Sequence, residues 1–248
     1  MTTALNFIDV SKRFGKAYAL ERVNFTVDRG LSFGLAGVNG AGKTTLLKCM
    51  LDLCSTSGGS IEIFGVSAVE NRARARLTFL PERFSPPYYQ NGRDFLRMMA
   101  GLRGDPYNDS HARLIFERLD LEASALTRPV RNYSKGMTQK LGLASCFLAD
   151  RELVILDEPM SGLDPKARAH VKDLLADLKR RGRTVFFTSH ALADIDETCE
   201  KMAVLDGGSL RFAGTPEALR AQTGAATLEG AFLRLIATPG AHASGADS

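Results

Sequence analysis

The fold of this 248-residue chain is decided by residues 37–44, which read Gly-Val-Asn-Gly-Ala-Gly-Lys-Thr. The stretch matches the pattern GxxxxGK[ST], in which glycines let backbone N–H groups turn inward around phosphate oxygens. An apolar run at residues 31–36 precedes it, and the helical pattern of residues 43–53 follows it. We therefore predict a strand, a phosphate-binding loop and a helix whose N-terminus faces the bound anion.

A second chemical element lies at residues 153–158, Leu-Val-Ile-Leu-Asp-Glu, an apolar strand that ends in two acids. Beside a phosphate loop, Asp157 is placed to bind Mg²⁺ directly or through water, together with the hydroxyl of Thr44. Lys43 would reach the β- and γ-phosphates, and Glu158 is placed where a general base could hold the attacking water. These two elements predict a nucleotide site. The phosphate loop alone does not distinguish kinases, GTPases and ATPases, and the acidic strand narrows this list.

Strand-like and helical segments alternate along the chain, which predicts an α/β fold with a largely parallel sheet. A block at about residues 91–150 differs, because Phe95, Met98, Met99 and Leu102 have the i, i+3, i+4, i+7 spacing of a helix. We predict that this block is a helical subdomain inserted into the core. Strands are expected at residues 6–10, 23–27, 31–36, 61–64, 77–80, 153–156 and 184–188, and a hairpin at residues 202–205 and 210–213.

Composition excludes several classes of protein. Apolar residues make up 44% and charged residues 24% of the chain, as in an ordinary globular protein. The net charge of +4 is too small to argue for a nucleic-acid partner. No run approaches the roughly 20 apolar residues of a membrane helix, no signal peptide is visible, and the four cysteines lack zinc spacing. We expect a cytoplasmic domain over residues 1–237, with reduced thiols, and a disordered tail at residues 238–248.

Three further motifs flank the acidic strand. Residues 132–141 read Asn-Tyr-Ser-Lys-Gly-Met-Thr-Gln-Lys-Leu, residues 161–164 read Ser-Gly-Leu-Asp, and residues 188–190 read Thr-Ser-His. In this order and spacing, the chain resembles the nucleotide-binding subunit of ATP-binding cassette (ABC) transporters over about residues 4–236. The Tyr-Ser-Lys-Gly-Met form and residues 228–235 look most like the ABC-2 type, whose ATPase subunits pair with separate permeases, mostly exporters. The resemblance implies a P-loop NTPase core with a mixed sheet, an N-terminal antiparallel β subdomain and the inserted helical subdomain.

The resemblance also implies roles for single residues. Phe14, with Tyr18 as the alternative, would stack on adenine, and His190 would contact the γ-phosphate and help to position the water. Ser134 and Gly136 would lie at a helix N-terminus that addresses the γ-phosphate held by a second copy, and Ser134 can also cap that helix. The implied ATP-binding residues are Phe14, Gly37, Asn39, Gly40, Ala41, Gly42, Lys43, Thr44, Thr45, Ser134 and Gly136.

Two departures from the family pattern matter. The family usually has Gln in the loop that joins the core to the helical subdomain, whereas Glu82 occupies that place here. A carboxylate can bind Mg²⁺ but cannot donate an amide hydrogen bond to the water. Gln90, deeper in the loop, is the other candidate for this role. Lys135 and Met137 replace the commonest signature residues, but the signature is still expected to work. The expected metal ligands are Thr44, Asp157 and Glu82.

The resemblance implies an ATP-hydrolysing subunit, with Mg²⁺, that powers a separate integral-membrane permease, an exporter. It would act as a homodimer at the inner face of the cell membrane, without nucleic acid. The permease would dock around residues 83–102, where residues 85–89 form an apolar-aromatic patch; the alternative for this patch is a packed loop. The alternatives are a soluble ABC ATPase of translation or DNA repair, whose second cassette, coiled coil or zinc hook is absent here, and a P-loop kinase. The transported substrate is not encoded in this chain.

Overall fold

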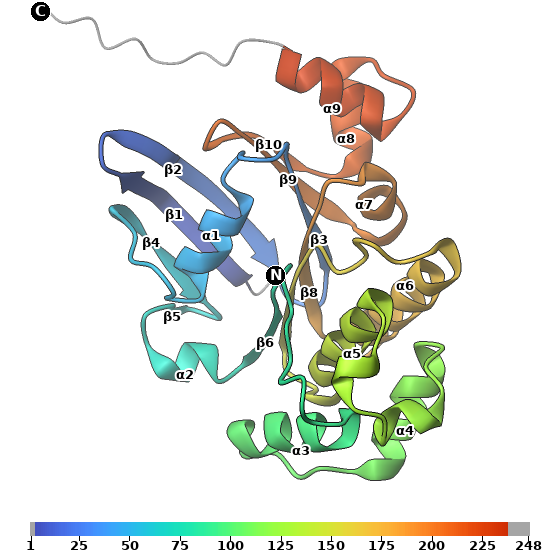
Figure 1. The fold of residues 1–248 in the computed structure, drawn as a ribbon. Helices are drawn as coiled ribbons and strands as arrows, with labels where there is room; N and C mark the ends of the chain where they lie inside the picture. The colour runs from blue at the N-terminus through green and yellow to red at the C-terminus, as the bar shows by residue number, and fades with distance from the viewer. Residues whose placement is uncertain (1–2, 238–248) are drawn as a thin grey trace, which may run out of the picture.

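The computed structural model describes residues 3–237, which form two β-sheets and a set of helices around them (Figure 1). One sheet is antiparallel, in the order β2-β1-β4-β5, and the other has the order β10-β9-β3-β8-β7-β6. In the second sheet neighbouring strands run parallel, except that β10 is antiparallel to β9. The strands are β1 (Thr3–Phe14), β2 (Ala17–Asp28), β3 (Ser32–Ala36), β4 (Gly58–Ile63), β5 (Val66–Ser67), β6 (Leu77–Leu80), β7 (Leu153–Asp157), β8 (Thr184–Ser189), β9 (Lys201–Asp206) and β10 (Ser209–Gly214).

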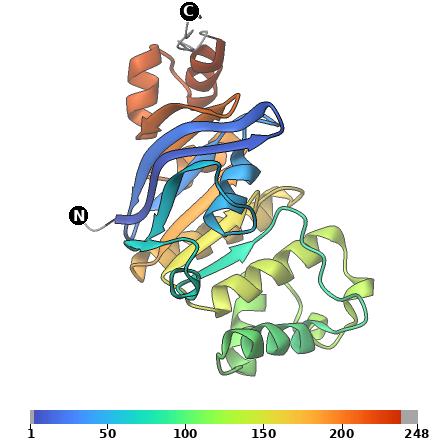
Figure 2. The same ribbon diagram turned by 90° about the vertical axis from the view of Figure 1, so that its left-hand side faces the viewer.

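Apart from one short helix directly before β6, the helices fall into three groups along the chain. One follows the phosphate loop, a second fills the stretch between β6 and β7, and a third alternates with the last strands. Figure 2 shows the second group at one end of the molecule and the C-terminal helices at the other. The helices are α1 (Lys43–Met50), α2 (Asn71–Arg74), α3 (Gly92–Arg103), α4 (Asp109–Arg118), η1 (Ala123–Leu126), η2 (Val130–Asn132), α5 (Lys135–Leu148), α6 (Pro165–Arg180), α7 (Leu192–Thr198), α8 (Pro216–Thr223) and α9 (Leu228–Ala237).

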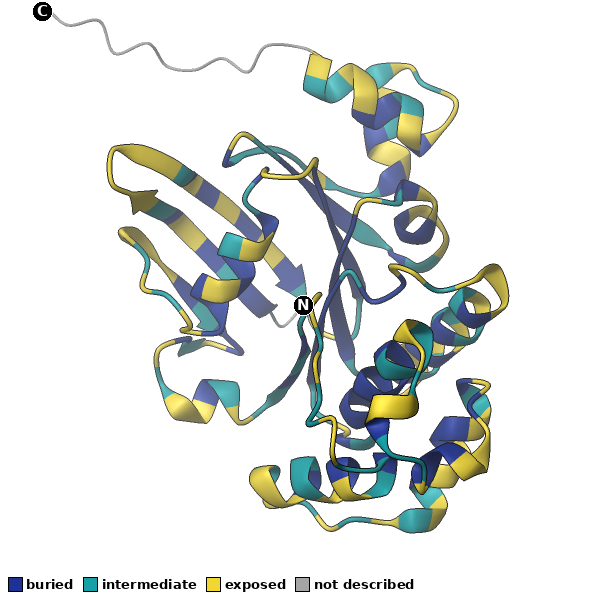
Figure 3. Ribbon diagram, in the orientation of Figure 1, coloured by how far each residue is buried: buried dark blue, intermediate teal, exposed yellow. Residues whose placement is uncertain are grey.

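The parallel sheet is buried on both faces, and Figure 3 shows its central strands dark blue throughout. Successive residues of β7 therefore enter two different cores: Val154 and Leu156 pack on the side of α5 and α6, and Ile155 packs on the side of α1. This explains why β7 and β8 have near-continuous apolar sequences instead of alternating ones. The ring of Phe33 lies 5.5 Å from that of Phe25 and 5.6 Å from that of Phe186, which joins the antiparallel sheet to the parallel one.

The fold class predicted from the sequence is confirmed, but some boundaries are wrong. β4 begins at Gly58, three residues before the predicted start, because Gly58 pairs with Ser11 of β1 despite its low strand propensity. α1 ends at Met50 instead of residue 53. Leu102 is 75% exposed, so the predicted apolar stripe of α3 does not extend to its last turn. The predicted tail at residues 238–248 lies outside the described residues.

Two other expectations concern the membrane and the thiols. Within residues 3–237, no helix is both long enough and apolar enough to span a bilayer. The four cysteines are free, as expected. Two of them are neighbours, since the sulfur of Cys49 at the end of α1 lies 3.5 Å from that of Cys54. Their separation of five residues at the end of a helix brings them together without forming any of the sequence patterns of a metal site.

Candidate nucleotide-binding site

The candidate site lies at the carboxyl ends of four neighbouring strands, β3, β8, β7 and β6. The phosphate loop follows β3, Asp157 ends β7, His190 follows β8, and Glu82 comes two residues after β6. Parallel strands end at a common edge, so these distant segments of sequence converge there. A cavity of about 680 Å³ opens at this edge. The predicted residues that line it are Gly37, Asn39, Gly40, Ala41, Gly42, Lys43, Thr44, Thr45, Glu82, Asp157, Glu158 and His190.

Three predicted ATP-binding residues do not line this cavity: Phe14, Ser134 and Gly136. Phe14 is 58% exposed at the end of β1, and Lys12 places its ammonium nitrogen 5.1 Å from the ring centre. Tyr18, the alternative platform, is also exposed and pairs with a guanidinium. Both aromatic rings are exposed and each has a cation over one face, and the stacking role remains a prediction for each.

The two candidates for the joining-loop role lie in different surroundings. Glu82 is exposed and lines the cavity. Gln90 is turned away from it: its amide nitrogen lies 3.5 Å from the sulfur of Met98, and its Oε1 is buried without a hydrogen-bond partner among the described residues. The geometry favours Glu82 over Gln90 as the residue that could approach a bound nucleotide.

The phosphate loop leaves the first N–H groups of α1 available to a ligand. The N-cap residue is Gly42, whose φ is 106°. Because glycine has no side chain, it cannot accept a hydrogen bond from these N–H groups, and the first turn carries no acidic residue. A Cβ at this position would lie 2.7 Å from the carbonyl oxygen of Ala19, so glycine is required for space as well as for its dihedral angle. A helix N-terminus of this kind fits an anion.

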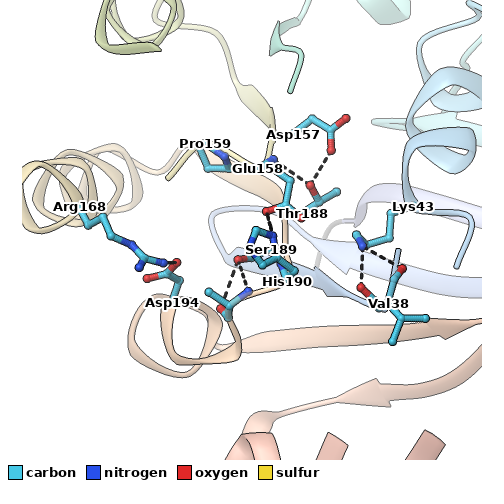
Figure 4. A network of polar contacts seen from close by, with 12 residues as sticks. Val38, Lys43, Asp157, Glu158, Pro159, Arg168, Thr188, Ser189, His190 and Asp194 are labelled. Atoms are coloured by element: carbon cyan, nitrogen blue, oxygen red, sulfur yellow. Dashed lines mark hydrogen bonds and ion pairs between the residues drawn. The ribbon is translucent and has the colours of Figure 1, made fainter. Parts of the chain in front are cut away.

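Lys43 is folded back onto its own loop (Figure 4). Its Nζ donates to the carbonyl oxygen of Gly37 at 2.6 Å and to that of Val38 at 3.3 Å. Burial lowers the pKa of Lys43, while the nearby carboxylates of Glu158, Asp157 and Glu82 oppose that shift. The ammonium is thus buried against carbonyl oxygens, which phosphate oxygens would replace as stronger acceptors.

Asp157 and Glu158 are joined through one hydroxyl. Thr188 of β8 donates from Oγ1 to Oδ1 of Asp157 at 2.6 Å, and the backbone N–H of Glu158 donates to the same Oγ1 at 2.9 Å. Burial raises the pKa of Asp157, and the hydrogen bond from Thr188 opposes this shift. A buried carboxylate that accepts one hydrogen bond keeps acceptor capacity for a cation.

Glu158 is held close to His190. The backbone of Glu158 has φ of 50°, in the left-handed region that a side chain makes unfavourable. Its Oε2 lies 2.8 Å from Nδ1 of His190, and the His190 N–H approaches the same oxygen at 3.4 Å. His190 is 62% exposed, whereas the Glu158 side chain is only 11% exposed. The pair therefore presents a fixed carboxylate and an accessible imidazole at the cavity.

These donors fit the predicted Mg²⁺ and triphosphate. Mg²⁺ prefers oxygen ligands and is usually bound through one or two carboxylates together with substrate phosphates. The hydroxyl of Thr44 and the carboxylates of Asp157 and Glu82 are the predicted ligands, and all three residues line the cavity beside the uncapped helix. When bound here, Mg²⁺ would supply positive charge that neutralises the negative charge of the phosphate oxygens.

The signature segment lies at the exposed N-terminus of α5. Ser134 caps this helix by accepting from the backbone N–H of Met137 at 3.2 Å. A Cβ on Gly136 would find Leu163 no closer than 3.8 Å, so the helix surface is open there. Asp164 caps the next helix, α6, by accepting from Ala167 N at 2.8 Å. In a single chain the signature and the phosphate cavity are therefore separate surfaces.

Sequence reasoning missed several residues of the cavity. Its wall includes Ala19, Val38, Ser189, Leu192 and Phe232. Phe232 belongs to α9, which packs on α7 near His190, and no local pattern could have shown this. Thr188 belongs to a motif that the sequence analysis had noted for its histidine alone. Its double hydrogen bond could have been suspected only from the register that sets it opposite Asp157.

Comparison with known proteins agrees with this geometry. The sequence model of the family described as ABC transporter matches residues 20–161. The chain belongs to this family. It is 40% identical over 211 residues to an uncharacterized ABC transporter ATP-binding protein of Nostoc sp., an alignment that covers 82% of this chain and 62% of that one. It is 36% identical over 208 residues to the fluoroquinolones export ATP-binding protein of Mycobacterium tuberculosis, covering 82% and 67% of the two chains.

The structural comparison covers more of the molecule. A solved structure described as the ATP binding subunit of an ABC transporter matches with a TM-score of 0.85 and 29% identity. The match covers 94% of this chain and 99% of that one. By sequence, however, the chain spans about three fifths of the Nostoc relative, 62% of its length. Family membership and fold are therefore established.

Proposed function

We propose that this chain binds ATP with Mg²⁺, hydrolyses it, and thereby powers a separate membrane permease that exports its substrate. The observation that carries the proposal is the convergence, at one cavity, of the uncapped N-terminus of α1, Lys43 and the Glu158–His190 pair. A kinase would need a second substrate site, whereas a carboxylate paired with an imidazole suits the activation of water. Export is supported by the likeness to the mycobacterial export protein.

The chemistry follows from these positions. Lys43 and the N–H groups of α1 would hold the β- and γ-phosphates, and Thr44, Asp157 and Glu82, which line the same cavity, would hold Mg²⁺. Glu158 accepts a proton from the attacking water. The oxygen of this water bonds to the γ-phosphorus, and the bond between the γ-phosphorus and the β–γ bridging oxygen, which leaves with ADP, breaks. His190 fixes the carboxylate and offers a hydrogen bond to the γ-phosphate, because its ring is exposed beside Glu158. Positioning and charge stabilisation supply most of the rate in such reactions.

We propose further that the site is completed by a second copy of the chain. Ser134 and Gly136 stand outside the cavity, on an exposed helix N-terminus, so they could approach a γ-phosphate only across an interface. Phe14 faces solvent at the edge of β1 and would gain a partner by stacking on adenine. Closure of two copies on ATP, and opening after hydrolysis, would be the movement passed to the permease.

The permease is proposed to dock at the cytoplasmic face of the membrane, on the loop between β6 and α3. Tyr88 and Tyr89 are 69% and 70% exposed there, with their rings in an edge-to-face contact at 5.6 Å. This loop starts beside Glu82, which lines the nucleotide cavity. An exposed aromatic pair next to the site suits a partner that must respond to the nucleotide.

Release of phosphate from Mg·ATP by the purified chain tests the proposal. The wild type should release phosphate, and Lys43→Ala should lose turnover by about 10²-fold or more, because it removes the charge from the β- and γ-phosphates. The matched control is Lys48→Ala, an exposed lysine on the same helix that does not line the cavity. Unchanged turnover in folded Lys43→Ala, or a wild type that binds no ATP, would overturn the assignment.

A further inference from the structure

Thr188 occupies an unusual position between the two acids of the site. It is fully buried in β8, and the parallel register sets it opposite Asp157. Figure 4 shows its hydroxyl between the Asp157 carboxylate and the backbone of Glu158. The same oxygen donates to Asp157 Oδ1 at 2.6 Å and accepts from Glu158 N at 2.9 Å. One hydroxyl therefore touches both residues to which the chemistry has been assigned.

The direction of these two hydrogen bonds is fixed by counting protons. A hydroxyl has one proton, and the backbone N–H of Glu158 can only donate. The Thr188 oxygen must therefore accept from Glu158, so its single proton points at Asp157. This orientation fixes Oδ1 of Asp157 as an acceptor and leaves its other oxygen for a cation. It also holds the N–H of Glu158, whose φ of 50° needs support from its surroundings.

We propose that Thr188 is a positioning residue that sets the metal-binding carboxylate of Asp157 and the water-activating carboxylate of Glu158 with one hydroxyl. The inference rests on the proposed function, since it assigns Thr188 a role in Mg·ATP binding and hydrolysis. Thr188 is fully buried and does not line the cavity. It acts by holding Asp157 Oδ1 and the backbone from which the Glu158 side chain reaches His190.

The competing explanation is that Thr188 merely satisfies buried polar groups. The same strand offers a matched control, because Thr184 is also buried and its hydroxyl accepts from the backbone N–H of Gly30 at 3.0 Å. Thr184 lies at the start of β8, whereas Thr188 lies at the other end of the strand, directly before Ser189, which lines the cavity. Thr184→Val and Thr188→Val thus remove the same hydroxyl from the same strand, and only one of them is beside the acids.

The experiment measures Mg²⁺ dependence and turnover separately in the full chain. A fluorescent N-methylanthraniloyl derivative of ATP is titrated with Mg²⁺, and its metal-free binding is measured in EDTA. Thr188→Val should raise the half-saturating Mg²⁺ concentration by about 10-fold or more, the usual effect of removing an outer hydrogen bond from a metal ligand. Metal-free binding should stay within about two-fold, because the phosphate loop is untouched. The kcat should fall by roughly 10- to 100-fold, since Glu158 loses its backbone anchor.

The controls separate positioning from stability. Thr188→Ser keeps the hydroxyl and should recover most of the Mg²⁺ dependence and the kcat. Thr184→Val should lower the melting temperature by a few degrees, roughly as much as Thr188→Val does, and leave both readouts unchanged. If Thr188→Val does not fold, the alanine pair at the same two positions gives the same comparison.

The outcomes are distinct. If Thr188→Val behaves like Thr184→Val, with unchanged Mg²⁺ dependence and kcat, the positioning role is overturned while the proposed function stands. If the wild type shows no Mg²⁺-dependent nucleotide binding at all, both the function and the inference that rests on it are overturned. A selective effect at Thr188, restored by serine, supports the inference.

Discussion

The N-termini of α1 and α5 carry the two motifs that should contact phosphate, and they are finished in opposite ways. At α1, Gly42 leaves the first N–H groups without a side-chain acceptor, inside a cavity that the chain has built around them. At α5, Ser134 accepts from Met137 N and thereby satisfies part of the helix end in the open. An uncapped helix end is stable only with a ligand or water, whereas a capped one tolerates exposure.

This difference indicates how the site is divided. The α1 end lies in a cavity whose walls come from this one chain, with Asp157, Glu158 and Lys43 lining it. The α5 end is a capped and exposed helix N-terminus. In the proposed dimer it would contact an anion only when the second copy carries that anion. We therefore expect substitutions around the α1 end to reduce nucleotide binding or hydrolysis directly. Substitutions at the α5 end should reduce hydrolysis only by weakening the contact between two copies.

The largest effect is expected at Glu158. Glu158→Gln keeps the size of the side chain but removes the proposed proton acceptor, so turnover should fall by about 10²- to 10⁴-fold while ATP still binds. Phosphate release and nucleotide binding measure the two separately. Near-normal turnover would mean that His190 or Glu82 takes the proton and that Glu158 is not the general base of this cavity.

Gly136→Ala tests the role of the α5 N-terminus. The new Cβ meets nothing closer than 3.8 Å within the chain, so the fold should be as stable as before or slightly more so. It stands on the surface that would meet the partner's γ-phosphate, so turnover should fall by roughly 10- to 100-fold with unchanged ATP binding by the single chain. Gly101→Ala, also open and on α3, is the control. Equal turnover in both variants would remove α5 from the site.

A smaller effect is expected at Glu82. It is one of three carboxylates that face Lys43, and a carboxylate near a triphosphate repels it unless Mg²⁺ lies between them. Glu82→Gln should therefore improve binding of metal-free ATP by roughly five-fold, the factor given by about 1 kcal/mol of screened repulsion. Binding measured in EDTA gives this value, and turnover with Mg²⁺ should change only a few-fold. No change in EDTA would place Glu82 out of reach of the nucleotide.

The smallest effect concerns the contact between the helical block and the core. The Arg118 guanidinium, 2.9 Å from Asp177, holds the pKa of that carboxyl below its usual value, with Arg180 adding to the effect. A lowered pKa stabilises the fold above the unfolded pKa of about 3.9, and this contribution is lost as pH falls through the folded value. Asp177→Asn should therefore destabilise the fold by less than about 1 kcal/mol at neutral pH, and by nothing in strong acid.

Urea unfolding of Asp177→Asn at neutral and acid pH measures this difference. Asp173→Asn, an exposed carboxylate one turn earlier on α6, is the control and should show a smaller difference at neutral pH. A loss of stability that persists unchanged in acid would show that packing, and not charge, joins α4 to α6.

The phosphate loop and the acidic strand were predictable because each is a local pattern with its own chemistry. The start of β4 was not, since Gly58 joins the strand only through pairing with β1. The place of Phe232 at the cavity depends on how α9 packs on α7. The double hydrogen bond of Thr188 depends on the register between β7 and β8. Contacts between distant segments, not residue types, were what the sequence could not supply.

The separation of Ser134 from the cavity has the same origin. The motif predicts a helix N-terminus near phosphate, and the structure gives the helix N-terminus but not the proximity within one chain. The resemblance to the family had implied a second copy for this reason. The position of Ser134 outside the cavity supports the proposed interface between two copies, since the two helix ends do not meet within one chain.

The most direct test of this division is the mass of the Glu158→Gln chain in sedimentation velocity, with and without Mg·ATP. The slow variant should keep ATP in place, so the account predicts a single chain without nucleotide and a two-chain species at saturating Mg·ATP. The dimer should disappear again when Gly136→Ala is added, while each chain still binds ATP. A Glu158→Gln chain that is saturated with Mg·ATP and remains a monomer at every concentration would contradict the claim that two copies complete the site.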